Sequence, residues 1–124
     1  MFVCASIAAC RKHPRKVERL SKKGTTVLAF PGRYGRIRVP DLLERLYVEQ
    51  IGSILVEGGG EVFQQFVDAG CVDELSLFVA PRLSRGGPAA FGVALAADGA
   101  LARSASSLEV RQVGRDILLH ALFD

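Results

Sequence analysis

The feature that most constrains this fold is a run of three glycines between two apolar stretches. Residues 53–56 are Ser, Ile, Leu and Val, and Glu57 follows them. Gly58, Gly59 and Gly60 then lead into residues 61–69, where apolar side chains recur at helical spacing. This order predicts a buried strand over 53–56, a tight turn, and a helix from about residue 61 to 69. Such a unit requires a sheet with helices packed against it, so we expect an α/β fold.

The same segment is the strongest candidate for a binding site. Glycine lets the backbone approach a ligand because it has no Cβ atom. A helix start offers unpaired N–H groups and a partial positive charge, and together these favour phosphate. The spacing differs from the GxGxxG dinucleotide fingerprint, and no Gly-Lys-Ser/Thr follows as in a Walker A loop. A strand-to-helix turn that uses glycine only for its geometry remains the alternative.

Strands and helices alternate along the rest of the chain. Apolar and β-branched runs predict strands at residues 2–7, 25–30, 75–80, 108–113 and 117–123. Helices are expected from Pro14 to about Lys23, ended by Gly24, and after Pro40. The second of these helices carries an apolar stripe formed by Leu42, Leu43, Leu46 and Tyr47. Residues 82–106 are rich in Gly, Ala and Ser and are not assigned.

This order of elements predicts a single domain over residues 1–124. Its sheet is expected to be mostly parallel, since strands and helices alternate through the first two thirds of the chain. The last two strands are expected to form an antiparallel hairpin that turns at Gly114 and Arg115.

The charge is unevenly distributed. The chain has a net charge of +3 and a pI near 9.0. Between Arg11 and Lys23, eight basic or potentially basic residues accompany one acid, Glu18. Such a cluster suits an anionic ligand such as phosphate, and the alternative is the solvated face of a helix. Aromatic residues are not interleaved with these charges, so nucleic acid is not an expected partner.

The cysteine pattern indicates reduced thiols. Cys4, Cys10 and Cys71 are odd in number and lack the close spacing of metal ligands, so neither a disulfide framework nor a metal site is expected. The apolar residues 1–10 are interpreted as a buried strand rather than an export signal, and no apolar run has the length of a membrane helix. We therefore expect a cytoplasmic protein without a membrane partner.

Several short motifs around the glycine run carry a family resemblance. The motifs are Val56-Glu57-Gly58-Gly59, Ala69-Gly70, Val72-Asp73-Glu74-Leu75 and Val79-Ala80-Pro81. They resemble the C-terminal reductase domain of the riboflavin-biosynthesis deaminase/reductase proteins, and residues 54–67 also resemble true dihydrofolate reductases. The resemblance implies a dihydrofolate-reductase-like three-layer fold with helices on both faces of the sheet. The family domain begins upstream of Met1, so the first strands are expected to be lacking.

The resemblance also implies a reaction. In that family, NADPH reduces 5-amino-6-(5-phosphoribosylamino)uracil, a phosphoribosyl-pyrimidine, to its ribityl product, and hydride passes directly from the nicotinamide. By position, the cofactor would lie against Gly58, Gly59, Gly60 and Glu61, with Ser6, Arg11 and Lys12 near the adenosine 2′-phosphate. Glu57 would lie at the substrate, and a homodimer is expected. No residue is assigned as catalytic.

Some assignments have alternatives. Ser6 could cap a strand, and Arg11 and Lys12 could be plain surface charges. Glu61 departs from the family, because relatives often carry Thr or Ser where this acid would face a diphosphate. The function could instead be that of a pterin reductase or of a non-catalytic remnant that binds nucleotide or a protein. Glu57 favours the riboflavin reaction, because the pterin enzymes usually have an apolar residue there.

Overall fold

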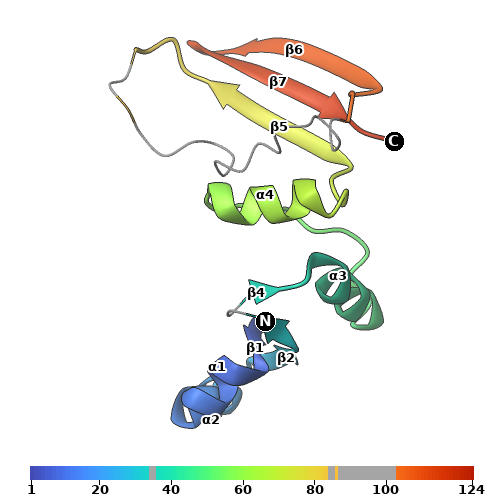
Figure 1. Ribbon diagram of the computed structural model, residues 1–124. Coiled ribbons are helices and arrows are strands. Elements are labelled where there is room, and N and C mark those ends of the chain that lie inside the picture. The colour runs from blue at the N-terminus through green and yellow to red at the C-terminus, as the bar shows by residue number, and fades with distance from the viewer. Residues whose placement is uncertain (34–35, 84–85, 87–102) are drawn as a thin grey trace. The chain divides into compact units, whose positions relative to one another are not determined.

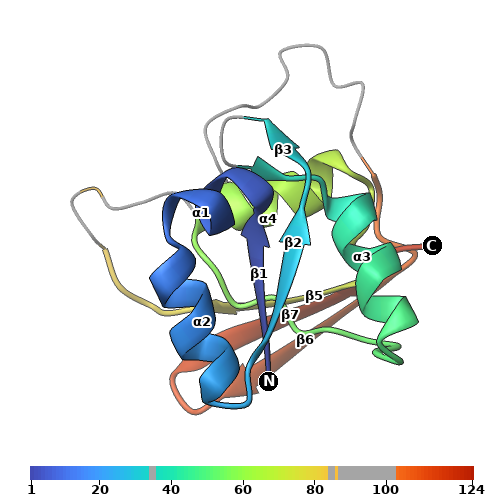
Figure 2. The same ribbon diagram turned by 90° about the horizontal axis from the view of Figure 1, so that it is seen from below.

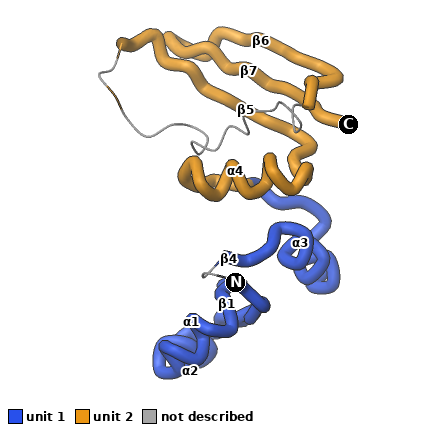
Figure 3. Tube along the Cα trace, viewed as in Figure 1, with its two compact units in different colours: residues 1–55 blue, residues 56–124 orange. Residues whose placement is uncertain are grey.

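The computed structural model describes residues 1–33, 36–83, 86 and 103–124. The chain forms two compact units, residues 1–55 and residues 56–124 (Figure 3). Each unit is built around its own strands and is described by itself. The single-domain organisation expected from the sequence stays a prediction.

The first unit is built on a parallel pair of strands joined by two helices. β1 (Phe2–Ser6) and β2 (Thr26–Phe30) pair in register from Phe2 opposite Thr26 to Ser6 opposite Phe30 (Figure 2). α1 (Ile7–Lys12) and α2 (Pro14–Lys22) connect the two strands. A parallel pair requires such a crossover, because a tight turn would reverse the chain direction.

The two helices of this connection begin and end at residues suited to those positions. Ser6 is the N-cap of α1, and Pro14 occupies the first turn of α2, where a missing N–H costs little. Gly24 follows α2 with a φ of +74°, a left-handed conformation that glycine adopts without strain. α2 was expected from the sequence, whereas α1 was not.

The rest of the first unit supplies its core. β3 (Gly32–Arg33) and β4 (Arg36–Ile37) form a short antiparallel pair, and α3 (Val39–Val48) follows. The core consists of the buried side chains of Leu28, Phe30 and Leu46, with Ile37, Leu42 and Ile51 packed against them. One helix and two strands therefore bury a common apolar cluster.

Two burial expectations for the first unit are wrong. Tyr47 is 74% exposed, so it does not share the buried side of α3 with Leu46. β1 is not fully buried either, because Phe2 is 37% exposed and Cys4 is exposed. Among the described strands, β1 has a single neighbour, β2, and parallel strands become buried when both faces are covered.

The second unit begins with a helix and ends with a three-stranded antiparallel sheet. α4 (Gly60–Asp68) is followed by Gly70, whose φ is +64°, and then by β5 (Glu74–Val79) (Figure 1). β6 (Ser107–Val113) and β7 (Asp116–Leu122) complete the sheet, whose strand order is β5-β7-β6. The strand that comes last in the sequence therefore lies in the middle.

The hairpin between β6 and β7 has a two-residue turn. Val113 pairs with Asp116, and Gly114 between them has a φ of +63°. A positive φ at the first central residue is the geometry of a type II′ turn, which favours glycine there. The C-terminal antiparallel hairpin predicted from the sequence is confirmed, as is the mixed α/β class.

The predicted strand over residues 53–56 is wrong. These residues have no regular secondary structure, and the side chains of Ile54 and Leu55 are 40% and 84% exposed. No described strand pairs with them, and an apolar run without a partner has no ladder of hydrogen bonds to hold it extended. The expectation of a mostly parallel sheet also fails within the described residues, where β1 with β2 is the one parallel pair.

Candidate functional site

The start of α4 presents unpaired backbone donors. Gly59 is the N-cap, with φ −82° and ψ 168°, and its side chain offers no capping oxygen. Its carbonyl accepts hydrogen bonds from the N–H groups of Val62 (2.9 Å) and Phe63 (3.2 Å). Within the described part of the chain, no acceptor faces the N–H groups of Gly60 and Glu61. These two donors and the helix dipole make this end of α4 suited to an anion.

The glycines before the helix have different roles. A Cβ atom at Gly58 would lie 3.0 Å from Cβ of Val62 and 3.2 Å from its Cγ1, so a side chain at position 58 would crowd the helix that it precedes. A Cβ atom at Gly59 would meet nothing within 4 Å. The open space beside the free N–H groups is therefore at Gly59, and the approach of a ligand is expected there.

The two acids that flank the glycines are exposed. Glu61 lies in the first turn of α4, where a carboxylate is favoured by the helix dipole, and its carbonyl accepts a hydrogen bond of 3.1 Å from Nε2 of Gln65. Glu57 lies in the irregular segment before the helix. It does not end a buried strand, and the residue is exposed. Its place at the substrate stays a prediction that rests on the family resemblance.

Ser6 lies at the carboxyl end of β1 and is 5% exposed. Its Oγ accepts a hydrogen bond of 3.2 Å from the N–H of Ala9, so it caps α1 rather than a strand. A Cβ atom at Gly32 would lie 3.2 Å from Cβ of Ser6, so Gly32 leaves space beside the serine. The hydroxyl still has its own proton to donate.

Arg11 and Lys12 are exposed in the last turn of α1, where cations are favoured by the helix dipole. Of the basic residues from 11 to 23, Lys22 forms an ion pair, 2.7 Å from Glu18, and the structure gives the others none. Unpaired exposed cations are available to an anion. Ser6 and Arg11 belong to the unit of residues 1–55 and the glycine turn to that of residues 56–124, so their union in one site stays a prediction.

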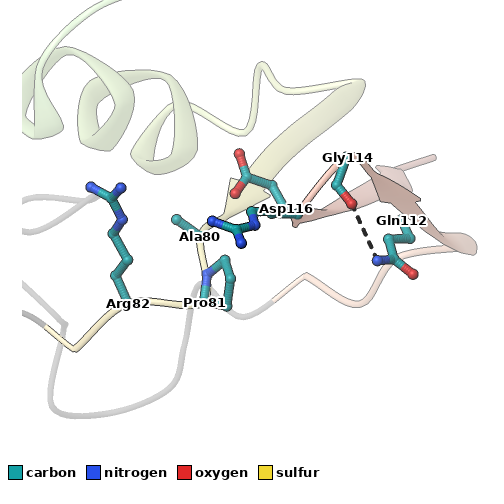
Figure 4. A pocket seen from close by; sticks show the side chains of 7 residues that line it. Ala80, Pro81, Arg82, Gln112, Gly114 and Asp116 are labelled. Carbon is teal, nitrogen blue, oxygen red and sulfur yellow. Dashed lines mark hydrogen bonds between the residues drawn. The ribbon is translucent and has the colours of Figure 1, made fainter.

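A second group of polar side chains, which the sequence did not predict as a site, lines a hollow of about 620 Å³ at the end of the sheet (Figure 4). Its lining comes from the end of β5 and the β6–β7 hairpin: Ala80, Pro81, Arg82, Gln112, Gly114, Arg115 and Asp116. Antiparallel pairing of β5 with β7 places Val79 opposite Ile117, which brings the two segments together. The signals in the sequence were Pro81 after β5 and the turn before β7. They indicate a site only once the pairing of β5 with β7 is known.

Other site chemistries find little support in the described residues. In this part of the chain, no group of three His, Cys, Asp or Glu side chains has the arrangement of a metal site. The three cysteines are free thiols, and partial desolvation raises the pKa of Cys4, although the residue is exposed. None of the described helices has the length and apolar character needed to cross a membrane.

Comparison with known proteins shows which family the sequence matches. The family model described as the RibD C-terminal domain matches residues 4–119. The riboflavin biosynthesis protein RibD of Bacillus amyloliquefaciens is 43% identical over 72 residues, which cover 58% of this chain and 19% of that protein. RibD of Escherichia coli (strain K12) is 35% identical over 97 residues, or 75% of this chain and 26% of that protein.

Solved structures show the same fold. Forms 2 and 1 of Acinetobacter baumannii RibD each match with a TM-score of 0.70, at 24% and 25% sequence identity. Each match covers 86% of this chain and 29% of the other. The chain thus spans about a fifth to under a third of the length of the proteins that it matches.

Proposed function

Since the chain belongs to the RibD C-terminal domain family, we propose that it contributes to the reduction step of riboflavin biosynthesis, with NADPH as the reductant. The substrate would be 5-amino-6-(5-phosphoribosylamino)uracil, and the product its ribityl derivative. The relatives are riboflavin biosynthesis proteins by name, which supports the pathway. The nucleotide is proposed from the geometry of the glycine turn.

The observation that carries this proposal is the start of α4. Two backbone N–H groups, those of Gly60 and Glu61, lack acceptors among the described residues, and the adjoining space at Gly59 is open. A diphosphate offers the oxygens that these donors lack, and the partial positive charge of the helix start favours it. The residues present therefore fit the phosphate part of a dinucleotide cofactor.

Bound NADPH would supply a hydride, and the chain's own residues would bind and orient. The hydride would form a C–H bond at the sugar carbon that bears the amine, and the bond from that carbon to the ring oxygen would break. A proton would go to that oxygen, which becomes a hydroxyl of the ribityl chain. Glu57 precedes the glycine turn directly, and its exposed carboxylate can accept hydrogen bonds from sugar hydroxyls. Glu61 adds a negative charge beside the proposed diphosphate, so it is expected to reduce the affinity for the cofactor.

A second candidate function is nucleotide binding without turnover. It is favoured by the irregular, exposed segment 53–56, which leaves Glu57 without a strand to fix its direction. A carboxylate that is not held in place orients a substrate poorly. Cofactor binding and turnover therefore have to be measured separately.

The first experiment measures the binding of NADPH by titration calorimetry. It compares the purified chain with two variants of Gly59. Gly59→Asp and Gly59→Asn both place a favourable capping side chain at the N-cap of α4, in space where nothing lies within 4 Å. Both variants should fold. The aspartate adds a negative charge where the diphosphate would lie, so the affinity should fall at least about tenfold more with aspartate than with asparagine.

Equal affinities for NADPH in the two variants and the unchanged chain would contradict the glycine turn as the diphosphate site. Saturable binding together with ribityl product would support the reductase. Saturable binding without product, in a reaction supplied with the phosphoribosyl-pyrimidine, would favour the second candidate.

We also propose that the chain forms a homodimer through the β5-β7-β6 sheet. The register places Leu108 and Val110 on one face with Leu119 and Ala121, and the first two are 62% and 59% exposed. Ala121 is 7% exposed, so the part of this face that water covers in one copy is on β6, and exposed apolar side chains are a typical association surface. Light scattering should give the mass of a dimer, and Val110→Lys should lower it toward that of one chain.

A further inference from the structure

The hollow at the end of the three-stranded sheet brings together two arginines that are far apart in the sequence. Arg82 follows Pro81 after β5, and Arg115 is the second residue of the β6–β7 turn. A hydrogen bond of 2.8 Å from the N–H of Arg82 to the carbonyl of Ala80 bends the chain tightly at this point. In Figure 4, the charged ends of Arg82 and Asp116 lie on either side of Ala80.

The charges in this hollow are not balanced within it. Arg82 and Arg115 are exposed, and the described residues offer no carboxylate within ion-pair distance of either. Asp116 is the one acid of the lining, and it is half-buried. Gln112 donates a hydrogen bond of 3.2 Å from Nε2 to the carbonyl of Gly114, so its amide holds the turn. Two guanidinium groups against one carboxylate leave a net positive hollow.

The neighbouring arginine on β6 has a different environment. Arg111 is bound by Glu109, with Nε 2.6 Å from Oε1 and Nη2 2.7 Å from Oε2. That bidentate pair satisfies Arg111 within its own strand. Arg82 and Arg115, by contrast, keep their donors free for a ligand.

The fold places this hollow at the same end of the second unit as the glycine turn. Residues 69–73 join the end of α4 to the start of β5, so the helix and the strand run in opposite directions (Figure 1). The start of α4 and the end of β5 therefore lie at the same end of the unit. A ligand with two separated anionic groups could engage both.

We propose that Arg82 and Arg115 form a second anion site, for a phosphate monoester. The planar guanidinium group donates paired hydrogen bonds whose geometry matches phosphate oxygens. The site itself stands on the hollow and its charges. The source of the phosphate rests on the proposed function: it is either the 5-phosphate of the substrate or the 2′-phosphate of the cofactor. The second source would replace Ser6 and Arg11 as the expected contacts of the 2′-phosphate.

The test is titration of the 15N-labelled full chain with inorganic phosphate, with the amide signals of Arg82 and Gly114 followed by NMR. Arg82→Gln and Arg115→Gln should each weaken phosphate binding about tenfold, since each removes a charge-assisted donor. Asp116→Asn should strengthen binding, because it removes the one negative charge of the lining. Arg111→Gln is the matched control and should leave the affinity unchanged.

Two further titrations identify which molecule carries the phosphate that binds in the hollow. Stronger binding of ribose 5-phosphate than of adenosine 2′-phosphate would assign the hollow to the substrate, and the reverse order would assign it to the cofactor. The proposal is overturned if Arg82→Gln and Arg115→Gln bind phosphate as the unchanged chain does, or if Arg111→Gln weakens binding as much as they do. Because Gly59→Asp tests the glycine turn and leaves this hollow intact, the two proposals can fail independently.

Discussion

The two units of the chain are stabilised in different ways. In the first unit, side chains from two strands and a helix meet in a small core around Leu28, Phe30 and Leu46. In the second unit, three antiparallel strands pair over six or seven residues each, while the buried apolar side chains among its described residues are Phe66 and Ala121. β6 has no buried residue. Among the described residues, the first unit thus depends more on side-chain packing, and the second more on its backbone ladder and turns.

This difference explains where each unit tolerates change. A buried side chain is held by many neighbours, so its removal leaves a cavity. An exposed strand residue can be replaced with little loss, but a turn residue with a positive φ cannot, because the ladder depends on the direction of the chain. Matched substitutions test whether side-chain packing governs the stability of the first unit and turn geometry that of the second.

The largest effect is expected for Phe30→Ala in the first unit. Phe30 is 4% exposed in the core, and truncation of a buried phenylalanine costs about 3–5 kcal/mol. The matched change Val113→Ala in the second unit removes a side chain that is 47% exposed and lies on the opposite face of β6 from Val110, so it should cost less than about 1 kcal/mol. Urea denaturation measures both. Similar losses would show that packing on β6 matters as much as the core of the first unit.

The next effect is expected for Gly114→Ala in the second unit. The φ of +63° at Gly114 costs an alanine about 1–2 kcal/mol, although a Cβ atom there would meet nothing within 4 Å. Gly52→Ala in the first unit is the control, because its φ is not positive and its surroundings are also open. That change should be neutral or stabilise the chain by less than about 1 kcal/mol. Thermal unfolding of both variants would show whether turn geometry governs the second unit.

A smaller effect is expected for Ser6→Ala. The substitution removes the hydroxyl that accepts the N–H of Ala9, and loss of such a cap costs about 1 kcal/mol. Ser21→Ala, at an exposed position inside α2, is the control and should cost nothing. If Ser6→Ala unfolds as the unchanged chain does, the capping hydrogen bond does not contribute to stability. NADPH affinity measured on the same variant tests the predicted contact with the 2′-phosphate.

The smallest effect on stability is expected from a change in pH. The hydrogen bond from Arg111 lowers the pKa of Glu109, and the charge of Arg111 acts in the same direction. A carboxyl whose pKa is lower when folded stabilises the sheet above its unfolded-state pKa, and this contribution is lost as the pH falls through the folded-state pKa. An NMR titration should find the Glu109 midpoint below the ordinary glutamate range. Arg111→Gln should raise it, and an unchanged midpoint would contradict the pairing.

The elements that could be predicted from sequence are those whose signals are local. Four residues mark helix or strand boundaries through their own backbone preferences, and the structure has each of these boundaries: Pro14, Gly24, Gly70 and Gly114. The helix α1 was missed although Ser6 is a good N-cap, because the apolar residues around it favoured a strand. The backbone preference of a single residue was sufficient to predict a boundary where that residue alone determines the local backbone geometry.

The predictions that failed concern features that depend on residues distant in the sequence. Residues 53–56 have the composition of a strand, but a strand exists only where another strand pairs with it. Glu57 was expected to follow the end of that buried strand, and this placement failed with it. The hollow around Arg82 and Arg115 could not be found from spacing, since it results from the pairing of β5 with β7. The glycine turn was found because its residues are contiguous.

The central position of β7 has a consequence for synthesis of the chain. β5 and β6 both precede β7 in the sequence, yet each pairs with β7 and not with the other. On the ribosome, β5 emerges before its only described neighbour has been made. At about 5–20 residues per second, the nascent chain carries β5 unpaired for a few seconds. During that interval its edge and its apolar side chains are open to chaperones, and β5 can pair with β7 only when β7 appears.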